Sequence, residues 1–489
     1  MILGLGVGLS RNTGGGGGGG FISPVVNYAA QGNLLFHCRP RDASTISESS
    51  NAITEVRDYN GSGRKWVPYS GVDAPTYGTR TQFGRNVIDF NGASQRLDGL
   101  SQASGLENIV NGQHTIYVVA TYDSIGSNDV VIGGEAAGGP DRMYIGNFRV
   151  LPRTTAQMVG DANTDTYPHV VVSARGASES RAYQDTLEFS DSPKTNASNS
   201  VLGLLTIGGR EAGAASDTFN GYIEDILIYE GLHTDEVRNR IIESLAFECN
   251  IPLPTWDYDV FLAAGQSNDG GQSQQAIEAE DQPYNPYIVQ IGRDASYDKK
   301  TIAGVQELNH FSGASGPGFP FKFAQLYAAT NPNKKILIVP SAAANTGFAS
   351  NDWNKGNARY EDAIDRVNTA MAYGTGTKTF KGILWHQGEN DSSLSEAAYA
   401  AALDQMISDM RTDITGATSS TPFVLGQLVP NFSGAAGVKA AILDTPNRVA
   451  NTAVVLNTDL TDRGDNIHYD RASLRILGQR YYDAFLTLI

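Results

Sequence analysis

The chain has 489 residues, of which 40% are hydrophobic and 9% aromatic, a composition typical of folded proteins. It carries 36 basic and 52 acidic residues, which gives a net charge of −16 with its seven histidines neutral. This balance argues against nucleic acid and anionic membranes as partners, and no apolar run reaches the length of a membrane span. The length exceeds what one hydrophobic core serves, so we expect two or three domains.

Residues 1–22 form a glycine-rich leader. Residues 1–9 mix glycine with apolar residues, and residues 14–20 are an uninterrupted glycine tract. The leader lacks the basic start and the cleavage site of a signal peptide, and by composition it is a flexible linker. Its order of residues is similar to the leaders of some bacteriophage tail proteins. This resemblance implies an attachment segment that binds other tail proteins.

Residues 23–250 are predicted to form an all-β domain. Short apolar runs, separated by clusters of Gly, Asn, Asp and Ser, lie at 115–120, 130–132 and 169–172. This spacing predicts a sandwich or jelly roll. In the run 219–229 the alternation of apolar and polar residues is imperfect, as expected of a strand covered on both faces. A helix capped by Thr234 is predicted to follow and to end at about Phe247.

Two patterns in this domain resemble known β-sandwiches. The strand beginning at 219–223, followed by a short helix, is similar to the end of laminin-G and concanavalin-like lectin domains. The segments 87–92 and 95–97 resemble the strand pair that opens many of them. The resemblance implies a jelly-roll sandwich, a fold that often binds carbohydrate. The aromatic residues Trp66, Tyr69 and Tyr77 fit sugar stacking and core packing equally well, so a glycan-binding role and a structural or trimerising role both stay open.

The two cysteines, Cys38 and Cys249, form no metal or redox motif. Two buried free thiols are favoured over a disulfide between them. We find no acidic cluster that requires calcium. We therefore predict no metal site and no cofactor.

Residues 251–256 are a proline-bearing linker to a second domain, 257–489. Continuous apolar runs of the buried parallel-strand type lie at 335–340, 382–385, 423–428 and 453–456. Helical patterns lie between and after them, at about 399–410 and 471–488. The alternation predicts a three-layer α/β sandwich with a parallel sheet. Active sites in such sheets gather at the carboxyl ends of the strands.

Three motifs fall at such strand ends or near the last helix. The apolar run 260–264 stops at Gly-Gln-Ser-Asn, residues 265–268, which places a serine on the turn after a buried strand. His-Gln-Gly-Glu follows at 386–389, and Asp-Asn-Ile-His at 465–468. In this order the motifs resemble the SGNH hydrolases, and more narrowly their sialate O-acetylesterase and acetylxylan esterase branch of carbohydrate esterases. The resemblance covers about 257–489.

The chemistry of the motifs assigns a catalytic triad. Ser267 is the candidate nucleophile, and because a hydroxyl at neutral pH needs a base, His468 is the candidate base. Asp465 lies three residues earlier on the same loop and is placed to fix the tautomer of the imidazole. Capping does not explain these two residues, since Asp470 is the better cap of the last helix.

The resemblance also implies an oxyanion hole with three donors. These are the backbone N–H of Ser267, a backbone N–H from a glycine loop, and a side-chain amide. Gly316 is the assigned loop residue, with Gly313 and Gly318 as alternatives. Gln387 matches the amide position.

Two further residues are predicted to support the site. Glu389 matches the branch motif and braces the site or assists His468, and Asn268 follows the nucleophile. His386 is predicted to be a packed core histidine and not a second base. One segment departs from the branch pattern. After the strand that ends near Pro340 the branch shows a glycine pair and a small hydroxyl residue, whereas this chain has residues 341–347, Ser-Ala-Ala-Ala-Asn-Thr-Gly. We expect this departure to affect the leaving-group and substrate contacts.

The expected function is a Ser-His-Asp esterase that removes O-acetyl groups from a polysaccharide through an acyl-serine intermediate. With the phage-like leader, the expected setting is a trimeric tail fibre or tail spike in the virion, acting on a host surface polysaccharide during adsorption. One alternative is a non-catalytic glycan-binding or structural tail protein. Another is a free secreted esterase with a lectin-like module, against which the missing signal peptide counts.

Overall fold

The computed structural model divides the chain into two compact units, Met1–Leu253 and Pro254–Ile489, and each is described by itself. The residues that the structure describes are 26–70, 73–82, 84–99, 112–123, 130–135, 142–146, 149–152, 158–159, 168–196, 204–209, 218–271, 275, 278, 281, 287–293, 299, 301–303, 317–331 and 334–489. The predicted leader, 1–22, lies outside them. Within these ranges no helix is long and apolar enough to cross a membrane.

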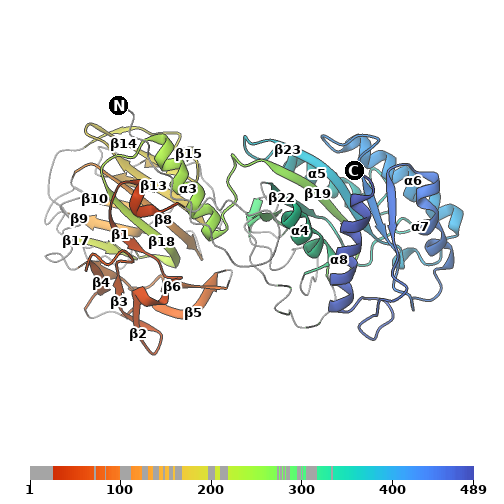
Figure 1. The fold of residues 1–489 in the computed structure, drawn as a ribbon, viewed down its shortest axis with the longest axis horizontal. Helices are drawn as coiled ribbons and strands as arrows, with labels where there is room; N and C mark the ends of the chain where they lie inside the picture. Colours follow the sequence, from red (N-terminus) through yellow and green to blue (C-terminus); the bar gives the residue numbers. More distant parts are fainter. Residues whose placement is uncertain are drawn as a thin grey trace. The chain divides into compact units, whose positions relative to one another are not determined.

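The first unit is built mainly of antiparallel strands (Figure 1). They are β1 (Asn33–Cys38), β2 (Ile46–Ser49), β3 (Ala52–Arg57), β4 (Lys65–Pro68), β5 (Thr76–Gln82), β6 (Arg85–Asn91), β7 (Leu97–Gly99), β8 (His114–Tyr122), β9 (Val130–Glu135), β10 (Arg142–Gly146), β11 (Arg149–Pro152), β12 (Met158–Val159), β13 (His169–Arg175), β14 (Glu179–Gln184), β15 (Leu187–Glu188), β16 (Lys194–Thr195), β17 (Leu204–Ile207) and β18 (Asn220–Glu230). Two 3-10 turns, η1 (Tyr28–Gln31) and η2 (Ala43–Thr45), and helix α3 (Asp235–Cys249) complete its described elements.

The pairing has two connected parts. Strand β18 pairs with β1, β6 and β8, and β8 continues the sheet to β13 and β14. Strand β17 joins β9 to β7, and β7 leads on to β4 and β3. Side chains of both parts meet in one hydrophobic cluster. The structure confirms a β-rich domain, as predicted, and shows its sheet to be antiparallel, while the assignment as a jelly roll of the concanavalin or laminin-G type stays a prediction.

Strand β18 explains the imperfect alternation of the run 219–229. The strand is buried on both faces, as predicted. In addition, its register with β8 shifts between Ile223 and Asp225. Such a bulge inserts one extra residue and exchanges the two faces. Ile223 before the bulge and Ile226 and Ile228 after it therefore all reach the same core cluster.

The other predictions for this unit are mostly confirmed. The side chain of Thr234 caps α3, which ends at Cys249, two residues beyond the predicted end. Both cysteines are free and buried. Of the three aromatic residues considered for sugar stacking, Trp66 and Tyr77 are buried. Only Tyr69 is exposed, at 44%, and the guanidinium of Arg96 covers its ring at 3.9 Å.

The second unit contains a seven-stranded sheet in the order β21-β20-β22-β19-β23-β24-β25. Its elements are β19 (Tyr258–Gly265), β20 (Ile288–Ile291), β21 (Thr301–Ala303), α4 (Phe319–Thr330), β22 (Lys335–Pro340), α5 (Ala358–Met371), β23 (Lys378–His386), η4 (Glu389–Asp391), α6 (Glu396–Asp413), β24 (Phe423–Gly426), α7 (Ala436–Arg448), β25 (Thr452–Val455) and α8 (Arg471–Leu486). All strand pairs are parallel except that of β21 with β20.

Two hydrophobic clusters place the helices on both faces of this sheet. Helices α5, α6 and α7 share one cluster with the sheet, and α4 and α8 share the other (Figure 1). The central strand β19 shows the division: Val260, Leu262 and Ala264 belong to the first cluster, and Phe261 and Ala263 to the second. A strand covered on both faces needs a continuous apolar run, which is the pattern of 260–264. The predicted parallel sheet with helices is confirmed.

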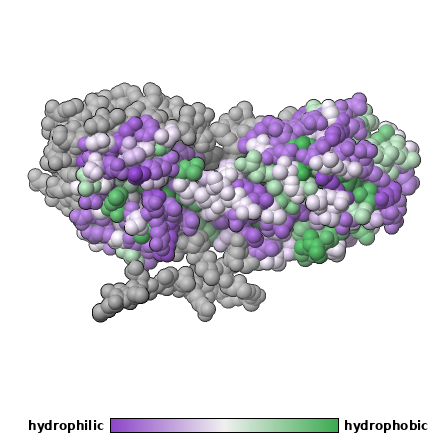
Figure 2. Space-filling model, turned by 90° about the horizontal axis from the view of Figure 1, so that it is seen from above, coloured by the Kyte–Doolittle hydropathy of each residue, from purple (hydrophilic) through white to green (hydrophobic). Residues whose placement is uncertain are grey.

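The surface of the second unit is mostly hydrophilic on the face in view, with small separate hydrophobic patches (Figure 2). Isolated apolar side chains of this kind are common on soluble folds.

Candidate active site

Strand β19 presents its carboxyl end at the point where the chain changes direction across the sheet. After β19 the chain builds β20 and β22 on one side and then crosses to β23 on the other. Ligands of open α/β sheets bind at such switch points. Ser267 lies two residues beyond the end of β19 and is 6% exposed, so the turn places its hydroxyl at this edge of the sheet.

The turn depends on Gly265, whose φ of +141° is rarely adopted by other residues. A Cβ atom there would stand 2.1 Å from the carbonyl oxygen of His386. The next residue, Gln266, donates its backbone N–H to the same oxygen at 2.9 Å. The turn of residues 265–268, called the nucleophile turn after its candidate nucleophile Ser267, is thus held directly against the end of β23.

The structure brings Ser267, His468 and Asp465 together. Ser267 Oγ lies 2.8 Å from His468 Nε2, across 201 positions of sequence. His468 Nδ1 lies 2.7 Å from Asp465 Oδ2. Because an ionised carboxylate only accepts hydrogen bonds, Nδ1 carries the proton, and Nε2 is left to accept the serine hydroxyl. This is the geometry that activates a serine.

Asp465 is held in its ionised form. Partial burial opposes its ionisation, but the backbone N–H groups of His468 and Ile467 donate to Oδ1 at 2.8 and 2.9 Å. The imidazole and the Nε–H of Arg463, at 2.7 Å, donate to Oδ2. Together these donors hold the pKa of Asp465 well below its usual range.

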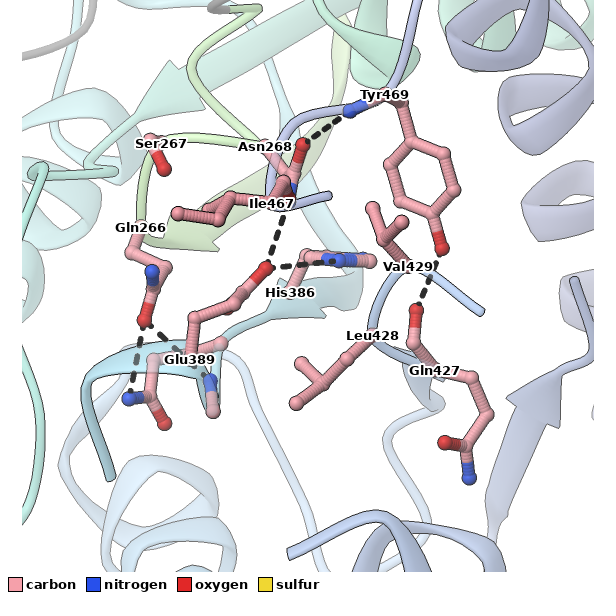
Figure 3. Close-up of polar contacts among 12 residues, drawn as sticks. Gln266, Ser267, Asn268, His386, Glu389, Gln427, Leu428, Val429, Ile467 and Tyr469 are labelled. Atoms are coloured by element: carbon pink, nitrogen blue, oxygen red, sulfur yellow. Dashed lines mark hydrogen bonds and ion pairs between the residues drawn. The ribbon is translucent and has the colours of Figure 1, made fainter. Parts of the chain in front are cut away.

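Asn268 joins the nucleophile turn to the loop of residues 461–470 (Figure 3). This loop carries His468, the candidate base, and is called the loop of the base. Its Nδ2 donates to the backbone carbonyl of Ile467 at 2.9 Å, and its Oδ1 accepts the backbone N–H of Tyr469 at 3.0 Å. Nδ2 also donates to Glu389 Oε1 at 2.6 Å. Asn268 and Glu389, both predicted as supporting residues, are therefore bonded to each other.

Glu389 and His386 are both buried. Burial raises the pKa of Glu389 to about 7, against hydrogen bonds that favour its charged form. Burial lowers the pKa of His386 to about 3, so its ring is neutral. The two side chains approach to 3.9 Å, and Nδ1 of His386 lies 3.2 Å from the hydroxyl of Tyr481 (Figure 3 shows the first pair). His386 is fully buried, as predicted.

The packing of Gln387 does not support its predicted role as an oxyanion donor. Its Nε2 lies 2.9 Å from Asp391 Oδ2, 3.1 Å from the carbonyl of Thr346 and 3.3 Å from Gln266 Oε1. Its Oε1 accepts from the hydroxyl of Tyr399 at 3.0 Å. An amide nitrogen has two hydrogens, and three acceptors already surround them. In this arrangement Gln387 braces the loops around the site.

The other residues predicted to line the oxyanion hole have different outcomes. Among the described residues, no acceptor takes the backbone N–H of Ser267, which leaves it free to bind a developing oxyanion. Gly316 and its alternative Gly313 lie outside the described residues. Gly318, the other alternative, precedes α4, and a Cβ atom there would stand 2.2 Å from the carbonyl oxygen of Asp269. Gly318 therefore packs directly against the nucleophile turn.

The loop after β22, which departs from the resembled pattern, also reaches the site. Ala343 donates its backbone N–H to the carbonyl of Gly265 at 3.0 Å. Asp391 accepts the backbone N–H groups of Phe348 and Ala349 at 2.8 and 2.9 Å. This loop is thereby fixed to both the nucleophile turn and the turn after β23.

Sequence reasoning missed three residues of this network: Gln266, Asp391 and Arg463. Gln266 Oε1 lies 3.4 Å from the N–H of Gly388 and 3.3 Å from that of Asn390 (Figure 3 shows Gln266 beside Glu389). Gln266 lies inside the Gly-Gln-Ser-Asn motif, and Asp391 lies two residues beyond the His-Gln-Gly-Glu motif. Their place in or next to a motif was the signal that could have found them. Nothing in the sequence singled out Arg463. The described residues contain no cluster of His, Cys, Asp and Glu suited to a metal ion.

Residues 257–487 match the family of carbohydrate esterases described as sialic acid-specific acetylesterases, SASA. The match supports the predicted esterase domain and lies within the second unit. The comparison with curated proteins gives no match.

Several solved structures resemble the chain. A protein from Arabidopsis thaliana is 21% identical, with 47% of this chain and 98% of that chain covered and a TM-score of 0.39. NanS is 19% identical, with 47% and 97% covered and a TM-score of 0.39. A carbohydrate acetylesterase from Xanthomonas citri is 16% identical, with 73% and 68% covered and a TM-score of 0.35.

Proposed function

We propose that the second unit is a serine esterase that removes O-acetyl groups from a carbohydrate. The observation that carries the proposal is the hydrogen-bonded series of Ser267, His468 and Asp465 at the end of β19. The carbohydrate esterase family match over 257–487 supports the class of substrate.

The proposed reaction begins with attack of Ser267 Oγ on the carbonyl carbon of the ester. His468 Nε2 takes the hydroxyl proton as the new C–O bond forms, and Asp465 stabilises the imidazolium. The negative charge that develops on the carbonyl oxygen is bound by the backbone N–H of Ser267. When the tetrahedral intermediate collapses, the sugar hydroxyl leaves with the proton from His468.

The acyl-serine is then hydrolysed. A water molecule attacks the acyl carbon while His468 takes its proton. Collapse releases acetate, and the proton returns to Ser267 Oγ. The two half-reactions use the same base, which is why one imidazole between Ser267 and Asp465 is enough.

Acetate release from an acetylated polysaccharide tests the proposal, with a small activated acetyl ester measured in parallel. The wild-type protein is expected to release acetate, and Ser267→Ala is expected to lose nearly all activity while remaining folded. Activity on the small ester alone would keep the esterase and reject the glycan tested. If the wild-type protein hydrolyses neither substrate, the esterase proposal is wrong, and a non-catalytic binding or structural protein is favoured.

We further propose that the polysaccharide lies on a bacterial host surface and that the protein is a trimeric component of a phage tail. The glycine-rich sequence of residues 1–22 and the β-rich first unit, proposed to be a lectin-like jelly roll, support this setting. Detection of the protein in purified particles tests it. An N-terminally processed protein in a culture medium would instead favour the free secreted esterase.

A further inference from the structure

The amide of Asn268 makes three hydrogen bonds that all converge on the site. Its two donors and one acceptor meet Ile467, Glu389 and Tyr469 at 2.9, 2.6 and 3.0 Å. Asn268 is 1% exposed, so water cannot replace these partners. It follows Ser267 directly, and its backbone therefore moves with the nucleophile.

Two of these partners flank the base. Ile467 precedes His468 and Tyr469 follows it, so Asn268 binds the loop on both sides of the imidazole (Figure 3). The carbonyl of Ile467 meets a donor and the N–H of Tyr469 meets an acceptor, which fixes the orientation of the amide. Glu389, buried and 121 positions away, accepts from the same nitrogen and reinforces that orientation.

We infer that Asn268 is a positioning residue that sets the distance between Ser267 and His468, with Glu389 as the group that orients its amide. The inference rests on the proposed esterase function and extends it. The loop of the base is also held by Tyr469, whose buried hydroxyl donates to the carbonyl of Gln427 at 2.8 Å, but that contact reaches the end of β24 and not the turn that carries Ser267. Asp465, which holds the imidazole, belongs to the same loop and moves with it. Asn268 supplies the link between the nucleophile turn and the loop of the base.

The expected loss of kcat on replacing Asn268 follows from the geometry of proton transfer. A base must lie within about 3.2 Å of the proton donor, and the present distance is 2.8 Å. A displacement of about 1 Å costs a reaction about 100-fold in rate. Losing Asn268 is therefore expected to lower kcat by about 100-fold, with a much smaller effect on KM.

The test is Asn268→Asp, which preserves size and removes both donors. At pH 8, above the pKa of about 7 of Glu389, the new carboxylate faces the carbonyl of Ile467 and an ionised Glu389, so repulsion replaces two hydrogen bonds. The matched control is Asn368→Asp. Asn368 on α5 also donates to a backbone carbonyl, that of Asp413, and accepts a backbone N–H, that of Thr415, at 3.1 and 2.8 Å.

Asn368 lies near the carboxyl end of α5, at the edge of the sheet opposite the site, because helices that connect parallel strands run antiparallel to them. Its Asp variant is expected to keep wild-type kcat on p-nitrophenyl acetate. Asn268→Asp is expected to lose about 100-fold, and Asn268→Asp with Glu389→Gln, which restores one hydrogen bond with donor and acceptor exchanged, is expected to recover part of that loss.

A crystal structure of Asn268→Asp gives a second readout that does not need activity. The expected result is a separation of Ser267 Oγ and His468 Nε2 beyond about 3.2 Å. Wild-type kcat, or a loop that stays in place in the variant, would overturn the inference. If the wild type fails to hydrolyse the ester, the proposed function fails, and the position of the loop in the variant still decides the role of Asn268.

Discussion

Gly265 and the carbonyl oxygen of His386 lie so close that a Cβ atom at Gly265 would stand 2.1 Å from that oxygen. The contact joins the ends of β19 and β23, which carry the nucleophile turn and the Gln-Gly-Glu turn. Glycine is required here by both space and backbone conformation.

Gly265→Ala is expected to destabilise the second unit by at least about 2 kcal/mol, since backbone strain adds to the clash. Gly434→Ala is the control. Gly434 has a φ of +80°, but no heavy atom lies within 4 Å of its added Cβ, so only strain remains. Urea denaturation measures both variants. Equal losses would show that the contact with His386 is unimportant.

Gln266→Leu is expected to destabilise the second unit by about 1–3 kcal/mol, because the buried backbone N–H of Gly388 and the partly buried one of Asn390 lose their shared acceptor. Gln405→Leu serves as the control, since Gln405 is exposed and its side chain bonds Asp409 on its own helix. Its stability is expected to change by less than about 0.5 kcal/mol. The prediction fails if the denaturation midpoints of the two variants coincide.

Asp465→Asn is expected to lower kcat by about 10⁴-fold. The carbonyl oxygen of the new amide must face the N–H groups of Ile467 and His468, so its NH₂ group faces His468 Nδ1. Nδ1 then becomes an acceptor, and Nε2 carries the proton that blocks abstraction from Ser267. The measurement is kcat on p-nitrophenyl acetate.

The control for that variant is Asp462→Asn in the same loop. Oδ1 of Asp462 accepts the N–H groups of Gly464 and Asn466 at 2.7 and 3.0 Å, and an asparagine oxygen does the same. This variant is expected to stay close to wild-type activity. A similar loss in both variants would attribute the effect to the loop as a whole and not to the tautomer.

Glu389→Gln is expected to change how stability depends on pH. The pKa of Glu389 is raised from 4.5 to about 7, so the folded protein binds a proton that the unfolded chain has already released between these values. Stability contributed by this group is therefore present below pH 4.5 and is lost as pH rises to about 7. A glutamine does not titrate and removes this loss.

The Tm of Glu389→Gln relative to wild type is thus expected to increase between pH 4.5 and pH 8. Glu396→Gln, at an exposed position in the first turn of α6, is the control and is expected to show no such trend. A constant difference in Tm across this range would mean that Glu389 titrates in the folded protein as it does in the unfolded chain.

Much of the second unit was predictable because its signals are local. The apolar run 260–264 requires a strand covered on both faces, and the structure places β19 at the centre of the sheet. The helical pattern at 471–488 corresponds to α8, with Asp470 as its cap. Since parallel strands present their carboxyl ends at one edge, motifs that follow them were expected to meet there.

The direction of individual side chains was not predictable in the same way. The amide of Gln387 chooses among acceptors that lie 4, 41 and 121 positions away, and no local pattern reports that choice. The bulge in β18 is a second example, because it arises from pairing with β8 and leaves only an irregular alternation in the sequence. Both features are set by tertiary contacts.

The distance of 201 positions between Ser267 and His468 has a consequence for the protein during its synthesis. A ribosome completes the serine turn long before it adds the imidazole that is to activate it, and domains begin to fold as they emerge. On the proposed mechanism, the nascent chain therefore carries an inert hydroxyl. Hydrolytic competence arises late, after the loop before α8 has been synthesised and His468 lies beside Ser267.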